Sequence, residues 1–164
     1  MTILVKNKHT LLVDEFKFRC CIGKKSTTIN KKEGDKKTPK GTFEIENLYF
    51  RKDRIKKPQT SLRCIEIKES MGWCDDISDP KKYNKLIKID KKLKHEKLKR
   101  KDYKYDLLIP IKYNFKKPVV GKGSCIFIHL TKGYNPTVGC IALKEKDFLI
   151  LLKLIKKKTR IKVV

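Results

Sequence analysis

Short apolar runs dominate this chain of 164 residues and limit what it can fold into. Several runs alternate apolar with polar positions, and polar segments rich in turn-forming residues separate them. Runs of this length and pattern are typical of β-strands. We expect strands at 2–5, 15–22, 42–45, 61–67, 107–113, 125–130, 140–143 and 160–164.

One segment departs from this pattern and predicts a helix over 144–157. Phe148, Leu151, Leu152 and Ile155 recur at the spacing that places side chains on one helix face, and lysines follow where the helix dipole favours cations. The chain has no internal repeat and no linker rich in Pro, Ser or Gly. We therefore expect a single, mainly β domain over 1–164, with one helix in its C-terminal half.

Three polar segments are expected to lie outside the strands. Residues 24–41 predict a surface loop, and a loop of this length in a small domain is usually functional or mobile. Residues 72–84, with one Trp and three Asp, predict a second loop. The basic segment 91–106 predicts a short helix or an exposed loop. Within 107–113, Pro110 has no N–H to donate, which favours an edge strand or a bulge.

The charge is strongly unbalanced, with 43 basic and 18 acidic side chains and a net charge of +25. Such a chain is attracted to polyanions, including nucleic acid and carboxylate-rich polymers. Only 6 of the basic residues are Arg, however, and Arg is the preferred residue for recognising phosphates and base edges. The lysines are scattered, so we favour a solvated basic surface and expect no obligate nucleic-acid partner.

The cysteines and histidines do not show the spacing of a zinc site. The chain has six Cys, no CxxC pair and three scattered His, so we expect neither a metal nor an organic cofactor. Most of the cysteines are expected to be small buried side chains. The first apolar run ends before Lys6, too early for a signal peptide, and no run is long enough to span a membrane.

The stretch "SCIFIHLTKGYNPTVGCIAL", residues 124–143, carries the strongest chemical signal. A cysteine attacks as the thiolate and needs a neighbour that takes its proton, which is commonly His. If the chain reverses between His129 and Cys140, the two become cross-strand neighbours in a hairpin. Gly139 would let the N–H groups of residues 139 and 140 face a developing oxyanion. A buried structural His and Cys is the competing interpretation.

These residues resemble the YkuD-type L,D-transpeptidase catalytic domain family. That family has a His at a strand end, a variable loop, and then Ser/Thr-His-Gly-Cys; here "IH" is followed by Thr-Val-Gly-Cys. The stretches "KKEGDKKTPKG", "GWCDD" and "HEKLKRKDYKYDLL" are similar to a compact branch of the family and keep its order. The resemblance covers roughly residues 16 to 164 and implies a β-sandwich-like fold.

The resemblance assigns roles to five positions of this sequence. It implies that Cys140 is the nucleophile and His129 its base, with the imidazole oriented by the main-chain carbonyl of Leu130 instead of an acidic residue. Gly139 would lie in the oxyanion region. Thr137 matches the Ser/Thr three residues before the nucleophile.

The sequence departs from the family pattern in three places. The loop from His129 to Cys140 is shorter than in most members. Val138 replaces the usual second His, and Ala142 stands where many members carry an Arg. These differences leave the nucleophile and base in place but change the residues expected to hold the substrate.

Several residues are candidates for that substrate-binding role. Arg100, Lys122 or loop lysines could replace the missing Arg, and Ser124 and Thr137 complete the candidate substrate-binding set. Four residues match the branch pattern without an assigned role, and a structural ion-pair network explains them equally well: Arg100, Asp102, Tyr105 and Asp106.

The resemblance implies acyl transfer on peptidoglycan stem peptides. The thiolate would attack the carbonyl of the diamino acid at stem position 3, and an amine of a second stem would resolve the thioester. A carboxypeptidase, in which water resolves it, shares every catalytic residue, and a non-catalytic basic module that binds polyanions is the third interpretation. We expect a monomer. The family role implies the cell envelope, whereas the absence of a visible leader favours the cytoplasm.

Other conspicuous residues have structural interpretations. We expect Cys125 to lie in the core and His95 to be solvated. Trp73 is expected to anchor a polar loop, although Asp75 and Asp76 beside it could form a substrate wall or metal-like cluster.

Overall fold

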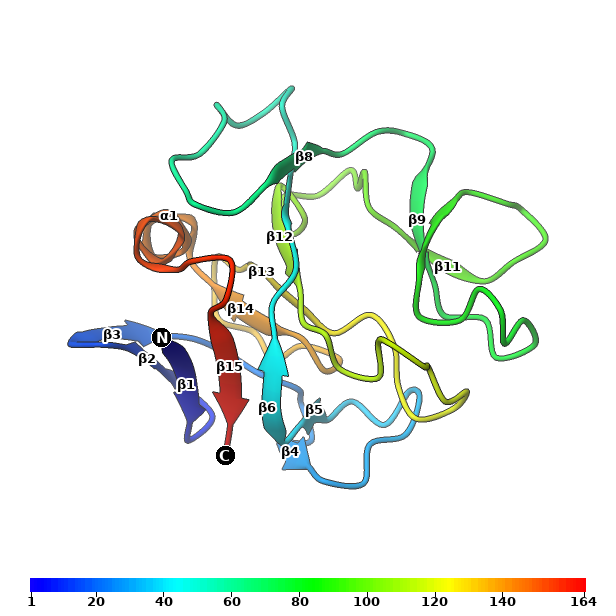
Figure 1. Cartoon of the computed structure of the whole chain (residues 1–164), viewed down its shortest axis with the longest axis horizontal. Helices are drawn as coiled ribbons and strands as arrows, with labels where there is room; N and C mark the ends of the chain where they lie inside the picture. Colours follow the sequence, from blue (N-terminus) through cyan, green and yellow to red (C-terminus); the bar gives the residue numbers. More distant parts are fainter.

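The computed structural model describes all 164 residues, with fifteen strands in four sheets and one helix (Figure 1). The expected mainly β fold with a single late helix is confirmed. The third and fourth sheets are small, and the first two, of five strands each, enclose the main core.

The first sheet brings the two ends of the chain together (Figure 1). Its N-terminal and C-terminal strands pair in parallel, with Ile3 opposite Ile161. The strand order is β3 (Phe16–Arg19), β2 (Thr10–Val13), β1 (Thr2–Lys6), β15 (Arg160–Val163) and β6 (Gly41–Glu44). The alternation of buried and exposed residues along β1 and β15 places one face of the sheet on the core.

The second sheet carries the residues singled out in the sequence. Its order is β14 (Ile141–Leu143), β13 (Phe127–Leu130), β12 (Leu107–Pro110), β7 (Leu48–Phe50) and β8 (Cys64–Glu66). All residues of β12, β13 and β14 are buried, so these strands are covered on both faces. Their continuous apolar runs follow from that double cover.

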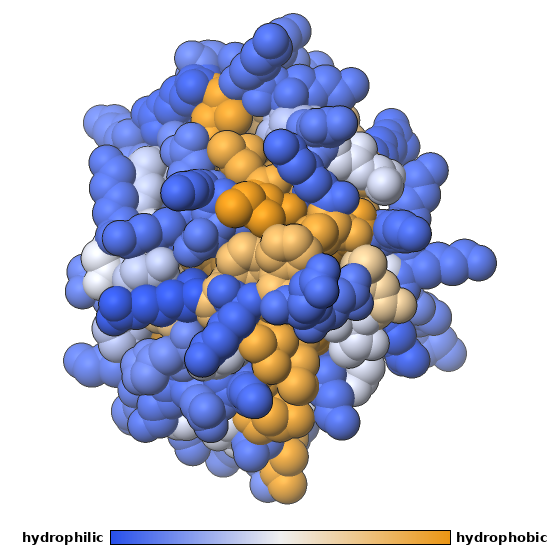
Figure 2. Space-filling view, turned by 90° about the vertical axis from the view of Figure 1, so that its left-hand side faces the viewer, coloured by the Kyte–Doolittle hydropathy of each residue, from blue (hydrophilic) through white to orange (hydrophobic).

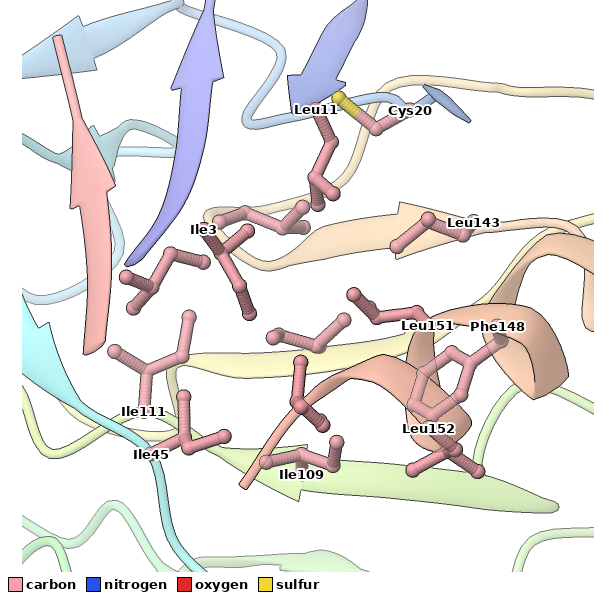
Figure 3. Packing of buried hydrophobic residues seen from close by; sticks show 14 of the residues in the cluster. Ile3, Leu11, Cys20, Ile45, Ile109, Ile111, Leu143, Phe148, Leu151 and Leu152 are labelled. Carbon is pink, nitrogen blue, oxygen red and sulfur yellow. The ribbon is translucent and has the colours of Figure 1, made fainter. Parts of the chain in front are cut away.

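The two faces of the second sheet belong to different cores. Leu107, Ile128 and Ile141 belong to the main cluster of 25 buried residues, which the first sheet and the helix share. Figure 3 shows part of this cluster, with Ile109 of β12 and Leu143 of β14 labelled. Leu108 and Phe127 point to a second cluster of eight residues on the opposite side. This alternation is the period of two that a strand imposes.

The second core is covered by a three-stranded sheet of order β10 (Leu86–Lys88), β9 (Met71–Cys74) and β11 (His95–Lys97). Trp73 of β9 packs edge-on against Phe127, with ring centroids 5.3 Å apart. The fourth sheet consists only of β4 (Thr27–Thr28) and β5 (Thr38–Pro39).

Helix α1 (Glu145–Leu154) is shorter than the predicted 144–157. Phe148, Leu151 and Leu152 form its buried face, and the three side chains point into the main core (Figure 3). Ile155 ends the helix with extended backbone angles but remains fully buried. The helical spacing of apolar residues therefore includes Ile155, which lies just beyond the last helical residue, and the predicted C-terminal end was too late for this reason.

No helix has the length and apolar character needed to cross a membrane. Hydrophilic side chains cover most of the face shown in Figure 2, and an apolar strip runs between them. This distribution agrees with lysines spread over a solvated surface.

The predicted hairpin between His129 and Cys140 is wrong. Strands β13 and β14 are parallel neighbours, with His129 opposite Ala142 and Ile128 opposite Ile141. Parallel neighbours require the connecting chain to return to the starting end of the sheet, and residues 131–140 make that return.

Two predicted loops contain strands. Strand β9 begins just before the expected loop 72–84, and β11 lies within 91–106, where a helix or an exposed loop was expected. The small sheet that they form with β10 depends on packing against the second core, because Leu98, next to β11, is completely buried.

Two further expectations need correction. Strand β12 is the central strand of its sheet and not an edge strand; Pro110 is tolerated because it lies past the residues that pair with β7. The segment 24–41 is not entirely a surface loop, because Lys31 and Thr38 are buried within it.

Candidate active site

The second sheet places His129 and Cys140 on one face. His129 lies in β13, two residues after Phe127, and Cys140 immediately precedes β14. The parallel register makes Phe127 the neighbour of Cys140, and the Phe127 N–H lies 3.4 Å from the Cys140 sulfur. Since side chains alternate along a strand, Phe127, His129 and Cys140 all face the second core.

His129 is held in one tautomer by the main chain. Its Nδ1 lies 2.9 Å from the Leu130 carbonyl oxygen, which can only accept, so Nδ1 carries the proton and Nε2 is left as an acceptor. The Tyr105 ring packs against the imidazole with centroids 5.5 Å apart. Burial lowers the pKa of His129 to about 4, so the imidazole is neutral at pH 7.

Cys140 is a protonated, buried thiol. Its side chain donates to the Cys125 carbonyl at 3.2 Å, and the residue is only 5% exposed. Burial raises the pKa of Cys140 to about 12, and the Phe127 N–H partly opposes this rise by favouring the thiolate. The resting site therefore holds a neutral thiol and a neutral imidazole.

The turn before Cys140 is fixed by hydroxyl groups. Thr137 Oγ1 donates to the Cys140 carbonyl at 2.6 Å and accepts from the Gly139 N–H at 3.1 Å. Thr38 Oγ1 donates to the Gly139 carbonyl at 2.8 Å. Gly139 has φ +144°, and a Cβ there would lie 3.0 Å from the Lys37 carbonyl oxygen. Glycine is required at this position by both backbone angle and space.

This turn changes the expectation for the oxyanion region. The sequence predicted that the N–H groups of both residues 139 and 140 would face it, but the Gly139 N–H is used by Thr137. The Cys140 N–H has no acceptor in the protein. Only this second group is free for a bound oxyanion.

Two cavities meet at Cys140. A cavity of about 230 Å³ is lined by Cys140, His129, Arg100 and Thr137. A larger one of about 690 Å³ is lined by Cys140 and Gly139 together with Ser124. Both buried functional groups are thus reached from solvent, and the nucleophile lies where the two cavities adjoin.

The candidate substrate-binding residues are divided between these cavities. Arg100 lies in the smaller one, held by a bidentate ion pair with Asp102 at 2.8 and 2.7 Å. Ser124 lies in the larger one and donates to Glu33 at 2.7 Å. Lys122 is exposed and lines neither cavity, so the structure does not bring it to the candidate site.

The positions that depart from the family pattern also line the cavities. Ala142 is buried in the wall of the smaller cavity, opposite His129 in the sheet. Arg100 lines this same cavity, so a guanidinium is present although position 142 supplies none. Val138 is 69% exposed and borders both cavities.

The sequence analysis missed Glu96, and it left the role of Tyr105 uncertain. Both residues line both cavities, and Tyr105 donates to Glu96 at 3.2 Å. Glu96 follows His95 in a segment read as solvated and basic. Pairing of this segment with β9 brings Glu96 opposite Trp73 and turns it to the second core. His95, Glu96 and Lys97 are all polar, so no alternation of apolar and polar residues marked this strand in the sequence.

Of the residues given structural interpretations, Trp73 lies as expected, whereas Cys125 and His95 differ from expectation. Trp73 is buried and donates to the Asn84 side chain at 3.0 Å, so it anchors its loop as expected. Asp75 and Asp76 line the larger cavity, but no group of three or more potential ligands could hold a metal ion. Cys125 is half-buried at the cavity wall, and His95 is half-buried with Nδ1 2.7 Å from the Leu93 carbonyl, not fully solvated.

A protein-family model matches nearly the whole chain. The model of the YkuD family, described as the L,D-transpeptidase catalytic domain, matches residues 1–163. Neither a curated protein nor a solved structure matches the chain.

Proposed function

Because the chain belongs to the YkuD family of L,D-transpeptidase catalytic domains, we propose that it transfers acyl groups of peptidoglycan stem peptides through a thioester on Cys140. The family itself supports L,D-transpeptidase-type chemistry on peptidoglycan. The observation that carries the proposal to individual residues is that His129 and Cys140 share one sheet face and line one cavity. The whole of residues 1–164 would form this single catalytic domain.

Acylation begins from the neutral pair. With a thiol pKa of about 12 and an imidazole pKa of about 4, a free ion pair is strongly disfavoured before substrate binds. Proton transfer to His129 Nε2 therefore accompanies attack of the sulfur on the carbonyl of the third stem residue. The Cys140 N–H, which has no protein acceptor, is placed to bind the oxyanion that forms.

The collapse of the tetrahedral intermediate breaks the peptide bond to the terminal D-residue. His129 gives its proton to the leaving amine, so this residue departs from the side of the smaller cavity, which His129 lines. A volume of about 230 Å³ suits one amino acid. Arg100 in the same cavity provides a cation for the terminal carboxylate.

The thioester is then resolved by an amine of a second stem. Nitrogen forms the new amide bond, the carbon–sulfur bond breaks, and the thiol regains its proton. Stem peptides carry several carboxylates, so the net charge of +25 raises their local concentration most strongly at low salt.

Intact-mass measurement tests the proposal. The protein is incubated with a stem tetrapeptide, and separately with a carbapenem, which acylates this family's nucleophile. We expect a covalent adduct that is absent from Cys140→Ser and strongly slowed in His129→Ala. No adduct with either compound, or an adduct on Cys140→Ser, would refute the proposal. Product masses identify the alternative: a free tripeptide without cross-linked product marks the carboxypeptidase.

A further inference from the structure

Glu96 lies where the two cavities meet. The proposed acyl-transfer steps give this residue no role. It pairs with Trp73 across β11 and β9, and Trp73 belongs to the same buried cluster as Cys140. Side chains directly opposite each other in an antiparallel pair point to the same face. Glu96 therefore faces the nucleophile, and it lines both cavities that meet there.

The carboxylate of Glu96 is only partly used by the protein. Its Oε2 accepts from the Tyr105 hydroxyl at 3.2 Å and lies 3.8 Å from Arg100 Nη1. Its Oε1 has no hydrogen-bond donor, and the side chain is 31% exposed. Glu33 in the larger cavity accepts from both Tyr83 and Ser124 at its Oε2, and it does not line the smaller cavity. Glu96 thus keeps one oxygen free at the border of the two cavities.

A negative charge at this position does not help the nucleophile to form. Burial is the main cause of the raised pKa of Cys140, and Glu96 raises it further, while Lys31 and Arg100 act in the opposite direction. In a chain with net charge +25, a carboxylate beside the reacting sulfur is conspicuous. It disfavours the thiolate but attracts a cation to the atoms that react.

We propose that Glu96 binds the ammonium group of the acyl acceptor and so favours an amine over water in resolving the thioester. This inference rests on the proposed function. The acceptor enters as R–NH₃⁺ because primary amines are protonated at neutral pH. Its nitrogen bonds to the acyl carbon and the carbon–sulfur bond breaks. Of the three ammonium protons, one stays on the amide nitrogen, one passes to the sulfur to restore the thiol, and one passes to solvent. Glu96 holds the ammonium at the thioester until the proton is lost.

The test compares Glu96→Gln with Glu69→Gln, which removes the same charge from a side chain that is 72% exposed and paired with Lys99. Acyl-enzyme is formed from a stem tetrapeptide and resolved by increasing concentrations of a stem tripeptide that supplies the amine. We expect Glu96→Gln to raise the acceptor KM about tenfold or more, as for loss of a hydrogen bond between charged groups. Its ratio of amide product to hydrolysis product should fall in parallel, and Glu69→Gln should match the wild type.

Two further measurements separate binding from a purely structural role. Hydroxylamine is uncharged at neutral pH, so its rate of thioester cleavage should be the same in Glu96→Gln and the wild type. Glu96→Asp, which keeps the charge, should recover part of the preference for the amine. Alkylation of Cys140 by iodoacetamide should shift to lower pH in Glu96→Gln, because the charge that opposes the thiolate is gone.

The outcomes distinguish this inference from the proposed function. An unchanged acceptor KM in Glu96→Gln, with normal acylation of the wild type, overturns the role of Glu96 and leaves the proposed function standing. An equal loss with hydroxylamine and with the amine also overturns it, since the defect would not depend on the ammonium. If the wild type forms no acyl-enzyme, the proposed function fails and this inference falls with it.

Discussion

Replacing Gly139 by Ala tests how tightly the turn before the nucleophile is packed. The substituted Cβ would lie 3.0 Å from the Lys37 carbonyl oxygen, a backbone atom that cannot rotate away. Backbone strain at φ +144° costs about 1–3 kcal/mol. Overpacking against a fixed neighbour costs about 1–3 kcal/mol more. We expect Gly139→Ala to lower the free energy of unfolding by about 2–6 kcal/mol.

A second glycine separates these two contributions. Gly34 also has a positive φ, +73°, but a Cβ there would have no atom within 4 Å. Gly34→Ala should therefore lose only the conformational part, about 1–2 kcal/mol. The excess loss in Gly139→Ala reports the contact between the 24–41 segment and the turn that carries Cys140.

Urea unfolding at equilibrium measures both variants under the same conditions. The m-value shows whether the extent of unfolding is unchanged, which the comparison requires. Gly139→Ala should also form the carbapenem adduct more slowly than Gly34→Ala, because its turn must shift. Equal losses of stability in the two variants would refute the reasoning, since only one of them meets the Lys37 carbonyl.

Three further predictions follow from the same structure. Thr137→Val removes the hydroxyl that bonds both the Cys140 carbonyl and the Gly139 N–H. It should lower the free energy of unfolding in urea by about 1–3 kcal/mol. Thr60→Val, at a half-buried loop position, should lower it less. Asn84→Ala removes the acceptor of the Trp73 indole and the donors to two loop carbonyls. It should lower the free energy of unfolding by about 2–4 kcal/mol and quench or shift the fluorescence of the single Trp. An unchanged spectrum would contradict the anchoring role. Burial lowers the pKa of His129 from 6.5 in the unfolded chain to about 4 in the folded protein. Between pH 6.5 and 4 the unfolded chain therefore binds more protons than the folded one. The free energy of unfolding should decrease by up to roughly 3 kcal/mol as the pH drops through this range. His129→Gln should remove that part of the slope, and an identical pH dependence in the variant would show that the imidazole is not buried as described.

The strand content of this protein could be read from the sequence because local pattern determines it. Alternating or short apolar runs fix β1, β3, β12 and β13 wherever one or both faces must be buried, and the late helix follows from a single apolar face. The candidate nucleophile and base, Cys140 and His129, were also identified from residue type and order along the chain. Their roles remain a prediction, and the expected position of the two as cross-strand neighbours was wrong, because His129 lies opposite Ala142.

Tertiary structure alone decided how these parts meet. A local pattern carries no information on strand partners, so the parallel pairing of β13 with β14 replaced the expected hairpin and placed Phe127 beside Cys140. The small sheet around β9 and β11 has weak local signals and forms because it covers the second core. That cover places Glu96, partly exposed, in the wall of both cavities that Cys140 lines. Charges distant in sequence become neighbours only when the layers pack, and this packing sets the electrostatics of the site.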